Sequence, residues 1–416
     1  MTSALPAWLD LDPAARRLRL SPREPAFVQD PYAAYAALHA DAPFVYWEDL
    51  GLWCVAGFDA VNRILRDRRF GRERPGGYLS AVAASGDRTA LADFDRVEAG
   101  SMLELEPPAH TRLRTLVNRA FVSRQVERLH PVIENLAHEL IDRFGEAGET
   151  DLISSFATPL PATVIAGMMG LPVETGPQLV AWSNDMVRMY QPSPGPDAMT
   201  RANRSARDFA AFIRDHADRR RREPSDDLLG VLVSAEAGGD RLSEDELVSS
   251  AILLLNAGHE ATVHQIGNAV VALLAHGDDP RRFFASDTQT AATVEECLRF
   301  DAPLHLFTRY AYEDAEIAPD ITLAKGEQVG LLLGAANRDP AAFHEPHRFD
   351  PARSDGRHVS FGAGIHFCIG APLARLELQV ALSVLFRRLP ELRLAEPPRW
   401  RDSWHFHGLE RLVVEW

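Results

Sequence analysis

The chain has 416 residues, of which 46% are hydrophobic and 25% are charged, as in an ordinary globular protein with a large core. Its formal net charge of -15 excludes the basic footprint that a nucleic-acid-binding protein needs. Three cysteines (Cys54, Cys297 and Cys368) are too few for a disulfide framework and indicate a reducing compartment. With no linker, targeting segment or long apolar run, we expect one cytoplasmic domain over residues 1–416 and no membrane span.

The helical signals dominate. A long helix begins at Ser243, where Ser243 and Glu246 have the spacing of a capping box, and it ends before Gly277. At 1.5 Å per residue this helix is about 50 Å long and crosses the whole domain. Apolar residues at helical spacing predict three further helices, over 131–144, 204–222 and 371–389.

The strand signals are fewer and short. Lys325 and Gly326 lie between two alternating segments and predict a hairpin that joins them. The predicted strands cover residues 53–56, 308–312, 321–324 and 328–333. The sequence therefore predicts a mainly α fold with small peripheral β-sheets.

Residues 361–370 read Phe-Gly-Ala-Gly-Ile-His-Phe-Cys-Ile-Gly and form the most informative segment. The glycines let the backbone pass close to a flat ligand, and a helix begins near Ala371. The amides and dipole at that helix start favour an anionic sulfur on Cys368. Taken alone, Cys368 could equally be a buried core cysteine. Its neighbours at fixed offsets favour a ligand for iron, to which a thiolate donates strongly.

This segment resembles the signature of the cytochrome P450 superfamily, Phe-x-x-Gly-x-(His/Arg)-x-Cys-x-Gly. The matching residues are Phe361, Gly364, His366, Cys368 and Gly370. The resemblance implies the P450 fold, with heme b between the long helix and the cysteine loop. It also implies that Cys368 is the axial iron ligand, that His366 contacts a heme propionate, and that Phe361 packs near the sulfur. Gly370 would adjoin the heme.

Glu296 and Arg299 match the Glu-x-x-Arg element of the family. Residues three apart lie on one helix face and can pair, although an isolated solvated pair contributes little. The resemblance implies a buried pair that locks the segment before the cysteine loop. Its third member is predicted to be Arg348, with Arg353 as the alternative.

Several cations are predicted to hold the heme or a partner. His110 and Arg114 share a helical face, and the resemblance implies that both, together with Arg309, contact the propionates. If they do not contact heme, each of these three residues would be an ordinary surface cation. The basic segment 112–128 is either a solvated helix face or the docking site of an acidic ferredoxin, with Arg112 and Arg119 in contact.

Residues 256–262 of the long helix read Asn-Ala-Gly-His-Glu-Ala-Thr, whereas the family pattern is Ala/Gly-Gly-x-Asp/Glu-Thr-Thr/Ser. Ala257 and Gly258 would open a groove over the heme, and Glu260 would relay protons. The first threonine is replaced by Ala261, which has no hydrogen-bonding side-chain atom. We expect His259 to lie on the helix surface or to contact residues that themselves contact the ligands. We do not expect it to bind a metal.

Three explanations for Ala261 remain open. A substrate hydroxyl with ordered water can replace the threonine, and this is the one we favour. Thr262 can serve instead, although it is rotated by about 100° around the helix. The third explanation is a reaction that does not need the usual second protonation step.

The resemblance places substrate contacts in segments that are apolar with scattered polar groups, as in a small-molecule cavity. Packing in loops and core is the alternative for each of them. The candidate pocket residues are Leu79, Met102, Asn256, Leu304, His305, Leu306, Phe307, Phe406 and His407. We expect a bulky, mainly apolar substrate with at least one hydroxyl or carbonyl.

The leading functional hypothesis is a heme-thiolate monooxygenase that inserts one oxygen atom from O2 into such a substrate. The expected reaction is a hydroxylation in secondary metabolism or catabolism, with electrons from ferredoxin and ferredoxin reductase. The alternative keeps the heme-thiolate but changes the outcome to oxidative coupling, desaturation, C–C cleavage or peroxide use. A non-catalytic heme sensor is a third hypothesis, against which Glu260 and the basic helix argue.

Overall fold

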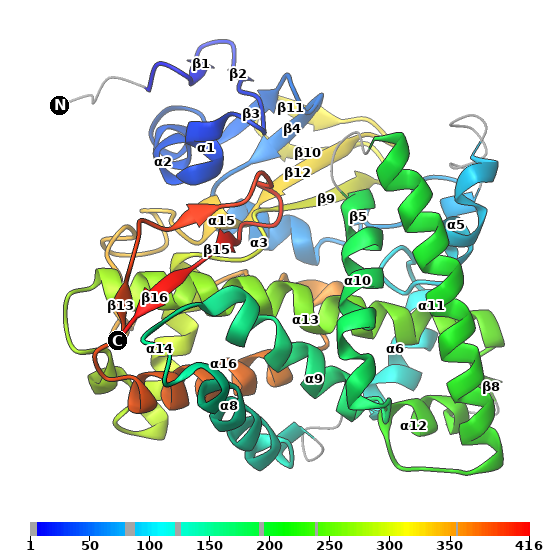
Figure 1. Cartoon of the computed structure of the whole chain (residues 1–416). Helices are drawn as coiled ribbons and strands as arrows, with labels where there is room; N and C mark the ends of the chain where they lie inside the picture. The colour runs from blue at the N-terminus through cyan, green and yellow to red at the C-terminus, as the bar shows by residue number, and fades with distance from the viewer. Residues whose placement is uncertain (1–5, 80–87, 121–125, 191–194, 238–239, 355–356) are drawn as a thin grey trace.

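The computed structural model describes residues 6–79, 88–120, 126–190, 195–237, 240–354 and 357–416. Its centre is helix α13, Glu244–Ala275, which runs through the middle of the molecule (Figure 1). The helix begins with the predicted capping box: Ser243 Oγ accepts from Glu246 N at 3.3 Å, and Glu246 Oε2 accepts from Ser243 N at 2.8 Å. Most residues of α13 are buried on all sides, as expected for a helix inside a large core.

Further helices surround α13. Those predicted over 131–144 and 371–389 are confirmed to within one residue, and the helix predicted over 204–222 begins earlier, at Pro196. The helices are α1 Pro25–Gln29, α2 Tyr32–Asp41, α3 Phe58–Arg66, α5 Ala92–Ala99, α6 Ala109–Ala120, α8 His130–Phe144, α9 Pro159–Met168, α10 Gly176–Val187, α11 Pro196–Arg222, α12 Leu228–Ser234, α14 Asp287–Phe300, α15 Leu333–Ala336 and α16 Ala371–Arg388.

The strands are short, and the largest sheet has seven, in the order β1-β2-β3-β4-β12-β9-β5. The smaller pairings are β10-β11, β13-β16-β6, β14-β15 and β7-β8. The strands are β1 Asp10–Asp12, β2 Arg17–Arg19, β3 Phe44–Trp47, β4 Leu52–Val55, β5 Phe70–Gly71, β6 Glu149–Asp151, β7 Glu236–Ala237, β8 Asp240–Arg241, β9 Leu306–Ala311, β10 Ala315–Ala318, β11 Ile321–Leu323, β12 Gln328–Leu332, β13 Arg393–Leu394, β14 Arg399–Trp400, β15 Leu409–Arg411 and β16 Val413–Glu415.

The predicted hairpin across Lys325 and Gly326 is wrong, although both of its strands exist. β11 pairs with β10, whereas β12 pairs antiparallel with β9 and parallel with β4. Gly326 N donates to Ala311 O at 2.7 Å, so the turn returns the chain to β9. Alternation locates a strand, but its partner is chosen by packing with distant residues.

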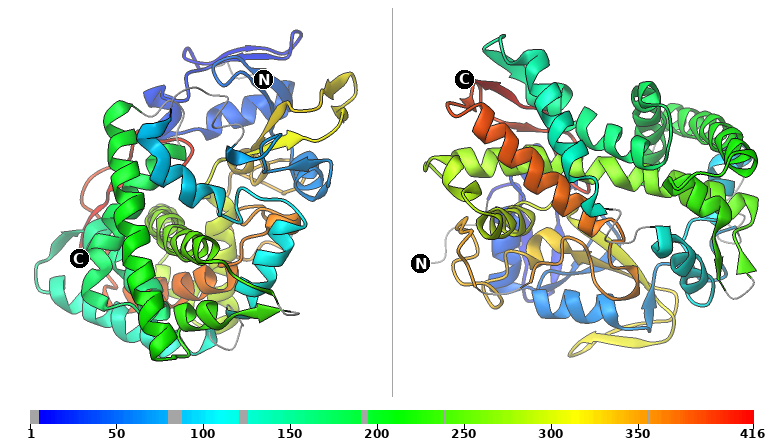
Figure 2. Two further views of the ribbon diagram at one scale, coloured as in Figure 1. Left: turned by 90° about the vertical axis from the view of Figure 1, so that its right-hand side faces the viewer. Right: turned by 90° about the horizontal axis from the view of Figure 1, so that it is seen from below.

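The core lies on both sides of α13. One apolar cluster joins α8, α9, α13 and α16, and a second joins α5, α10, α11, α12 and α13. α16 packs against α8, α13 and α14, and Figure 2 shows α16 crossing α13 beside α8. In the part of the chain that the structure describes, no helix is long and apolar enough to cross a membrane.

A buried ionic network ties α14 to the segment that leads to the cysteine loop. Arg299 donates from Nε and Nη2 to the two oxygens of Glu296 at 2.7 and 2.8 Å, and both side chains are only 3% exposed. Arg299 also donates to the carbonyls of Asn337 and Pro346, and the backbone N of Asp350 donates to Glu296. Such a pair is tolerable in the interior because every polar atom finds a partner.

The third member of this network is Arg353, and the prediction of Arg348 is wrong. Arg353 Nε donates to Glu296 Oε2 at 3.1 Å and its side chain is 10% exposed. The Arg348 side chain is 62% exposed and pairs with Glu345. Only its carbonyl enters the network, as an acceptor from Arg299 and Arg353, because the backbone turns the side chain outward.

We expect Arg353→Ala to lower the free energy of unfolding by about 3 kcal/mol, because part of the buried charge of Glu296 loses its partner. The matched control Arg348→Ala should change it by less than about 0.5 kcal/mol, as at an exposed site. Urea unfolding measures both values. Equal losses for the two variants would contradict this assignment.

Candidate functional site

Cys368 stands at the end of a tight loop, just before α16. Its backbone N donates to Phe361 O at 3.0 Å, which closes the loop. The thiol is exposed, whereas Cys54 and Cys297 are buried. Burial by the surrounding protein raises the pKa of the Cys368 thiol, although the backbone of Gly370 and the charge of Arg114 act to lower it. The sulfur is therefore open on one side and enclosed on the others.

Two of the loop glycines adopt a left-handed conformation, Gly362 with φ 67° and Gly364 with φ 72°. A Cβ on Gly364 would lie 2.3 Å from Leu65 O, so this glycine is needed for close approach to α3. This close approach to α3, and not the approach of a flat ligand, explains why residue 364 is a glycine. A Cβ on Gly370 would lie 3.9 Å from Cys368 Sγ, which is ordinary contact, so its predicted role beside the heme stays a prediction.

The surroundings of the sulfur are apolar and uncovered. Ile365 and Phe367, which precede Cys368 in the loop, are 38% and 39% exposed. The ring of Phe361 lies 6.3 Å from that of Phe367, and the guanidinium of Arg375 stands 4.6 Å over it. Exposed apolar side chains around an accessible thiol suit a flat, largely apolar ligand.

Two histidines and an arginine lie beside this surface. The rings of His110 and His366 are 4.3 Å apart, and His366 Nε2 lies 2.9 Å from Glu106 Oε1. Arg114 donates to Phe367 O at 2.6 Å. Burial, together with the nearby charges of His366 and Arg114, lowers the pKa of His110 to about 4. The structure thus brings together three of the four predicted propionate contacts.

The fourth contact, Arg309 on β9, is only 3% exposed. Burial lowers its pKa to about 9, and the charge of Arg72 adds to this effect. Among the described residues Arg309 has no ion pair, although a buried guanidinium normally requires an anion. Two carboxylates, as carried by heme, would complement this excess of cations, so the residues present fit that group.

Arg72 was not predicted and belongs to the same cationic group. It follows β5 and donates from Nη2 to Glu104 at 2.6 Å. Its charge also acts to lower the pKa of His366 and of Arg309. No motif surrounds Arg72 in the sequence, so only its position in space identifies it.

The open face of α13 is a stripe of small residues. Ala257 is exposed and Ala261 is partly exposed, whereas Thr262 is buried. Thr262 is rotated by about 140° from Ala257 around the helix, so its side chain lies on another face. The prediction that Thr262 supplies the missing hydroxyl is therefore not supported by its position.

Gly258 faces α9 and not the open stripe. A Cβ on Gly258 would lie 2.9 Å from Ile165 Cγ1, so the glycine permits close packing of two helices. α13 is also α-helical without interruption over its whole length. Neighbouring residues of an α-helix point about 100° apart, so Ala257 and Gly258 lie on different faces of α13. The expectation that the two residues together open a groove in this helix is therefore wrong.

Glu260 is buried with partners from two elements. Its Oε1 accepts from Arg401 Nη2 at 2.6 Å and lies 3.2 Å from His264 Nε2. His259 is also buried, with Nδ1 3.0 Å from Leu255 O, so of the two expected positions the helix surface is wrong and a place behind the ligand-contacting residues stays a prediction. His259 Nε2 lies 3.9 Å from Glu260 Oε2, so the two side chains are neighbours but not bonded.

Part of the predicted pocket lies where Leu304 pairs with Phe406 in an isolated antiparallel bridge. Both side chains are partly exposed, as is Phe307, while His305 and His407 are buried. The two histidine rings lie 4.6 Å apart on the other face, because strand side chains alternate.

The prediction that His305 and His407 contact the substrate is wrong. His305 Nδ1 lies 2.8 Å from Tyr35 Oη, and His407 Nε2 lies 3.4 Å from Asp301 Oδ1. The group formed by Asp301, His305 and His407 could also hold a metal ion by its spacing. The charge of Arg338 acts on Asp301, however, and disfavours a further buried cation there.

The remaining pocket residues differ in their surroundings. Asn256 is buried, with Nδ2 3.9 Å from Met186 Sδ, and its Oδ1 has no hydrogen-bond partner among the described residues. Met102 is buried in the apolar cluster with α5 and α13, and Leu306 is buried below the sheet, so core packing accounts for both. Leu79 is 59% exposed, next to residues outside the described ranges, and its pocket role stays a prediction.

The predicted redox-partner face is only partly described. The guanidinium of Arg112 pairs with Glu246 at the start of α13 and donates to Arg241 O at 3.3 Å. Arg112 is 32% exposed and already engaged in an ion pair within the chain, so its position does not support the predicted partner contact. The side chain of Arg119 lies outside the described residues.

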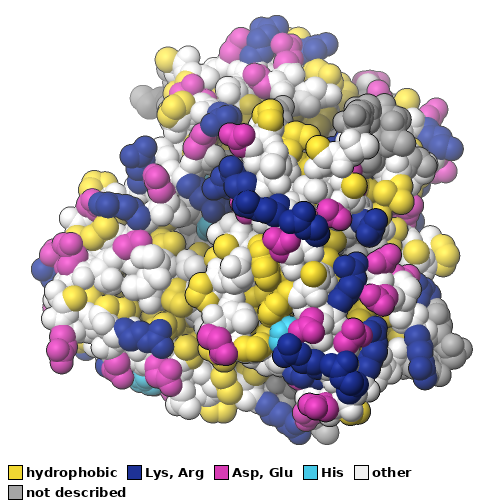
Figure 3. Space-filling model, turned by 45° about the vertical axis from the view of Figure 1, so that its right-hand side comes forward, with side chains coloured by type: hydrophobic (Ala, Val, Ile, Leu, Met, Phe, Trp, Pro, Cys, Tyr) yellow, Lys and Arg dark blue, Asp and Glu magenta, His cyan; other side chains and the backbone are white. Residues whose placement is uncertain are grey.

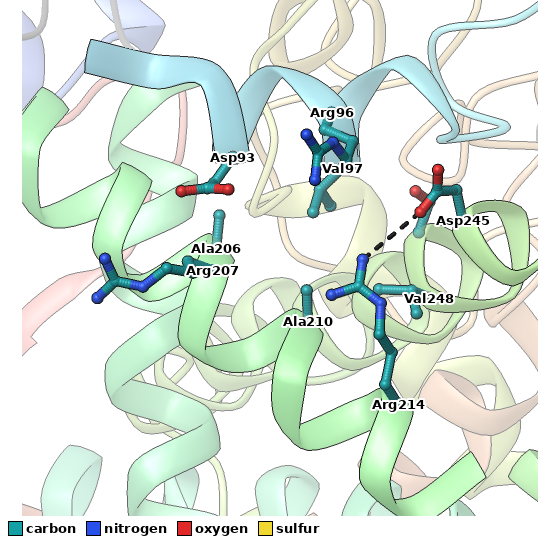
Figure 4. A pocket seen from close by; sticks show the side chains of 10 residues that line it. Asp93, Arg96, Val97, Ala206, Arg207, Ala210, Arg214, Asp245 and Val248 are labelled. Atoms are coloured by element: carbon teal, nitrogen blue, oxygen red, sulfur yellow. Dashed lines mark hydrogen bonds and ion pairs between the residues drawn. The ribbon is translucent and has the colours of Figure 1, made fainter. Parts of the chain in front are cut away.

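A surface pocket of about 320 Å³, its open mouth included, lies between α5, α11 and α13 (Figure 4). Charged side chains line it, among them Arg96 and Arg214, and Arg214 lies 3.5 Å from Asp245 across the mouth. On this side of the molecule basic and acidic side chains are interspersed (Figure 3). The pocket includes neither the cysteine loop nor the Ala257 stripe, and we assign it no part in the chemistry.

Known proteins resemble this chain over most of its length. The family model for Cytochrome P450 matches residues 288–395. The chain is 38% identical over 399 residues to the 6-deoxyerythronolide B hydroxylase of Saccharopolyspora erythraea, covering 94% of this chain and 96% of that protein. It is 37% identical over 391 residues to the biotin biosynthesis cytochrome P450 of Bacillus subtilis, covering 93% and 96%.

A solved structure gives the same result for the fold. P450BioI, in complex with an acyl carrier protein that carries hexadec-9Z-enoic acid, matches with a TM-score of 0.87 and 36% identity, over 94% of this chain and 100% of that chain. The predicted mainly α fold with small sheets is thereby confirmed as the P450 fold. Since full-length relatives of this identity share the family's heme-iron chemistry, the chain belongs to the cytochrome P450 family and is a P450 monooxygenase.

Proposed function

We propose that the chain binds heme b with the thiolate of Cys368 as the axial ligand. The observation that carries this proposal is the exposed Cys368 thiol in a loop whose preceding apolar side chains, Ile365 and Phe367, are also exposed. When bound, the heme with its thiolate ligand supplies the activation of dioxygen. Every other step depends on side chains of this chain.

Arginine and histidine side chains beside the loop hold the two heme propionates in this proposal. His110, Arg114, His366 and Arg309 are the propionate contacts, and Arg72 supports them through its charge. Support comes from the burial of Arg309, which has no carboxylate paired with it among the residues that the structure describes. A propionate would therefore satisfy a guanidinium that is now desolvated without an anion.

We propose further that the substrate is a bulky, mainly apolar small molecule that becomes hydroxylated in secondary metabolism or catabolism. Leu304, Phe307 and Phe406 are apolar and partly exposed, and Asn256 Oδ1, which has no partner within the described ranges, can accept a hydrogen bond. Relatives include a 6-deoxyerythronolide B hydroxylase and the polyketide biosynthesis P450 PksS. A polyketide of similar bulk is the first class to screen for a low- to high-spin shift of the iron.

A substrate hydroxyl takes the place of the missing threonine hydroxyl in this proposal. The open stripe at Ala257 and Ala261 leaves room for such a group, whereas Thr262 is buried on another face. The same feature motivates the second candidate, in which the heme-thiolate performs oxidative coupling, desaturation, C–C cleavage or peroxide-driven chemistry. Product analysis with and without a redox chain distinguishes the two candidates.

The electrons come, in our proposal, from a ferredoxin and its reductase, with docking at α6. The basic residues of 112–128 stand out in a chain of net charge -15 and would attract an acidic partner. Since Arg112 is held by Glu246, the docking contact assigned here is Arg119 alone.

The reduced protein should give a red-shifted Soret band with carbon monoxide, because the thiolate is the ligand of the iron. Cys368→Ser should abolish this band, whereas the control Cys297→Ala, a buried residue of α14, should retain it. Absorption spectra of the reduced carbonyl complexes make the comparison. A red-shifted band that survived in Cys368→Ser would refute the assignment.

We expect Ala261→Thr to lower the yield of product per NADH several-fold and to raise peroxide release, because the new side chain displaces the substrate hydroxyl. The control Thr262→Val removes a hydroxyl without changing the side-chain shape, and coupling should stay unchanged because Thr262 faces away from the open stripe. Product and peroxide are measured in parallel. If Ala261→Thr altered neither one, the proposed role of the substrate hydroxyl would be wrong.

Charge reversal in Arg119→Glu should slow electron transfer from an acidic ferredoxin by at least about tenfold at low salt and flatten its salt dependence. Arg112→Gln should leave the rate nearly unchanged, because that side chain already pairs with Glu246. Stopped-flow reduction at several salt concentrations measures both effects. The reverse ranking of the two variants would restore Arg112 as the docking residue.

A further inference from the structure

Glu260, His264 and Arg401 form a polar group that leads from the interior to the surface. Glu260 and His264 have side chains that are 8% and 4% exposed, whereas Arg401 is 31% exposed. Arg401 Nη2 and His264 Nε2 lie 2.6 and 3.2 Å from the same atom, Glu260 Oε1. His264 was not among the predicted site residues, because its position belongs to no family pattern.

His264 lies next to the position that lacks a hydroxyl. Around the helix it is about 60° from Ala261 and about 40° from Glu260, so it stands between their two stripes. Side chains of an α-helix lean toward its N-terminus, which places the imidazole over the turn that carries Ala261. An imidazole therefore lies within one turn of α13 from the position that lacks the hydroxyl.

The protein backbone is shaped to admit this ring. A Cβ on Gly408 would lie 2.0 Å from His264 Nδ1, so no side chain at 408 is compatible with the present place of the ring. Arg401 N donates to Gly408 O at 3.0 Å, so one hairpin both supplies Arg401 and makes room for His264. His264 Nδ1 is buried and lacks a hydrogen-bond partner among the described residues.

The charges around the pair favour transfer of a proton over its retention. Burial lowers the pKa of His264 and the charge of Arg401 adds to this, while the bond to Glu260 opposes it. Burial alone would raise the pKa of Glu260, but the bond from His264 and the charge of Arg401 hold it well below its usual range. His259 and His407 are the other titratable groups that act on this pair. Neither member of the pair traps a proton at neutral pH.

We propose that Glu260 and His264 act as an acid–imidazole pair that delivers protons to the oxygen-activating side of the site, where the substrate hydroxyl takes the place of the hydroxyl that Ala261 lacks. A proton from water binds His264 Nδ1 while the proton on Nε2 moves to the Glu260 carboxylate. Glu260 then releases that proton toward the reduced dioxygen, which restores its carboxylate, and no electron moves in this relay. The inference rests on the proposed function, because it assigns a proton route to the same reaction.

The first test follows the imidazole itself and needs no turnover. The test uses NMR of the reduced carbonyl complex, which is diamagnetic. The ring signal of His264 is identified as the histidine signal that the unmodified protein shows and His264→Gln lacks. Its pKa should fall in Glu260→Gln, which loses the carboxylate that raises it, and should rise in Arg401→Gln, which loses a nearby cation. A pKa that responded to neither variant would overturn the proposed pair, whatever the substrate is.

The second test measures proton delivery during turnover. The glutamine of His264→Gln can still donate to Glu260 but cannot accept a proton at one atom and release it at another. With the polyketide that gives the largest spin shift, product per NADH should fall by about tenfold or more, with a matching rise in peroxide. His276→Gln, at the exposed end of α13, should leave both unchanged, because its imidazole pairs with Asp278 and not with Glu260.

A further variant tests whether misfolding, and not the loss of the imidazole, causes the lower yield of product per NADH. Gly408→Ala keeps both ionisable groups but pushes a methyl group into the place of the ring, and it should uncouple turnover as His264→Gln does. Intact carbonyl spectra in both variants would show that heme binding is retained. Normal coupling in His264→Gln, with the NMR response present, would reduce the pair to a structural contact and overturn the proposal.

Discussion

The buried network of Glu296, Arg299 and Arg353 is the constraint on which the site depends. It joins α14 to the backbone of 337–353, and that segment leads directly into the cysteine loop. An ionic group in the interior tolerates little displacement, because any lost partner leaves a desolvated charge. The loop can therefore leave a thiol open on one side without collapsing over it.

The sequence predicts the parts of this molecule that follow from local pattern. The capping box at Ser243, the long helix and the exposed Cys368 before α16 all depend on residues within a few positions of one another. The Glu-x-x-Arg spacing likewise predicts a pair on one helix face. Such features need no knowledge of distant segments.

The errors arise where the answer depends on distant residues. Arg348 and Arg353 are equivalent in sequence, and only the path of the backbone selects the second. β12 pairs with β4 and β9 and not with its neighbour β11. His305 and His407 were expected in the pocket, but alternation along paired strands turns both toward Tyr35 and Asp301. Arg72 and His264 acquire meaning only when the fold brings them to the site.

The close approach of Gly364 to Leu65 has a consequence for folding. The two residues come from opposite ends of the chain, so their contact closes a very long loop, and its entropy is lost only when most of the molecule has assembled. The position of the Cys368 sulfur therefore depends on the contact between its loop and the N-terminal helix α3. A C-terminal fragment that kept the whole cysteine motif would still lack the support that fixes it, so cofactor capture should be among the last events of folding.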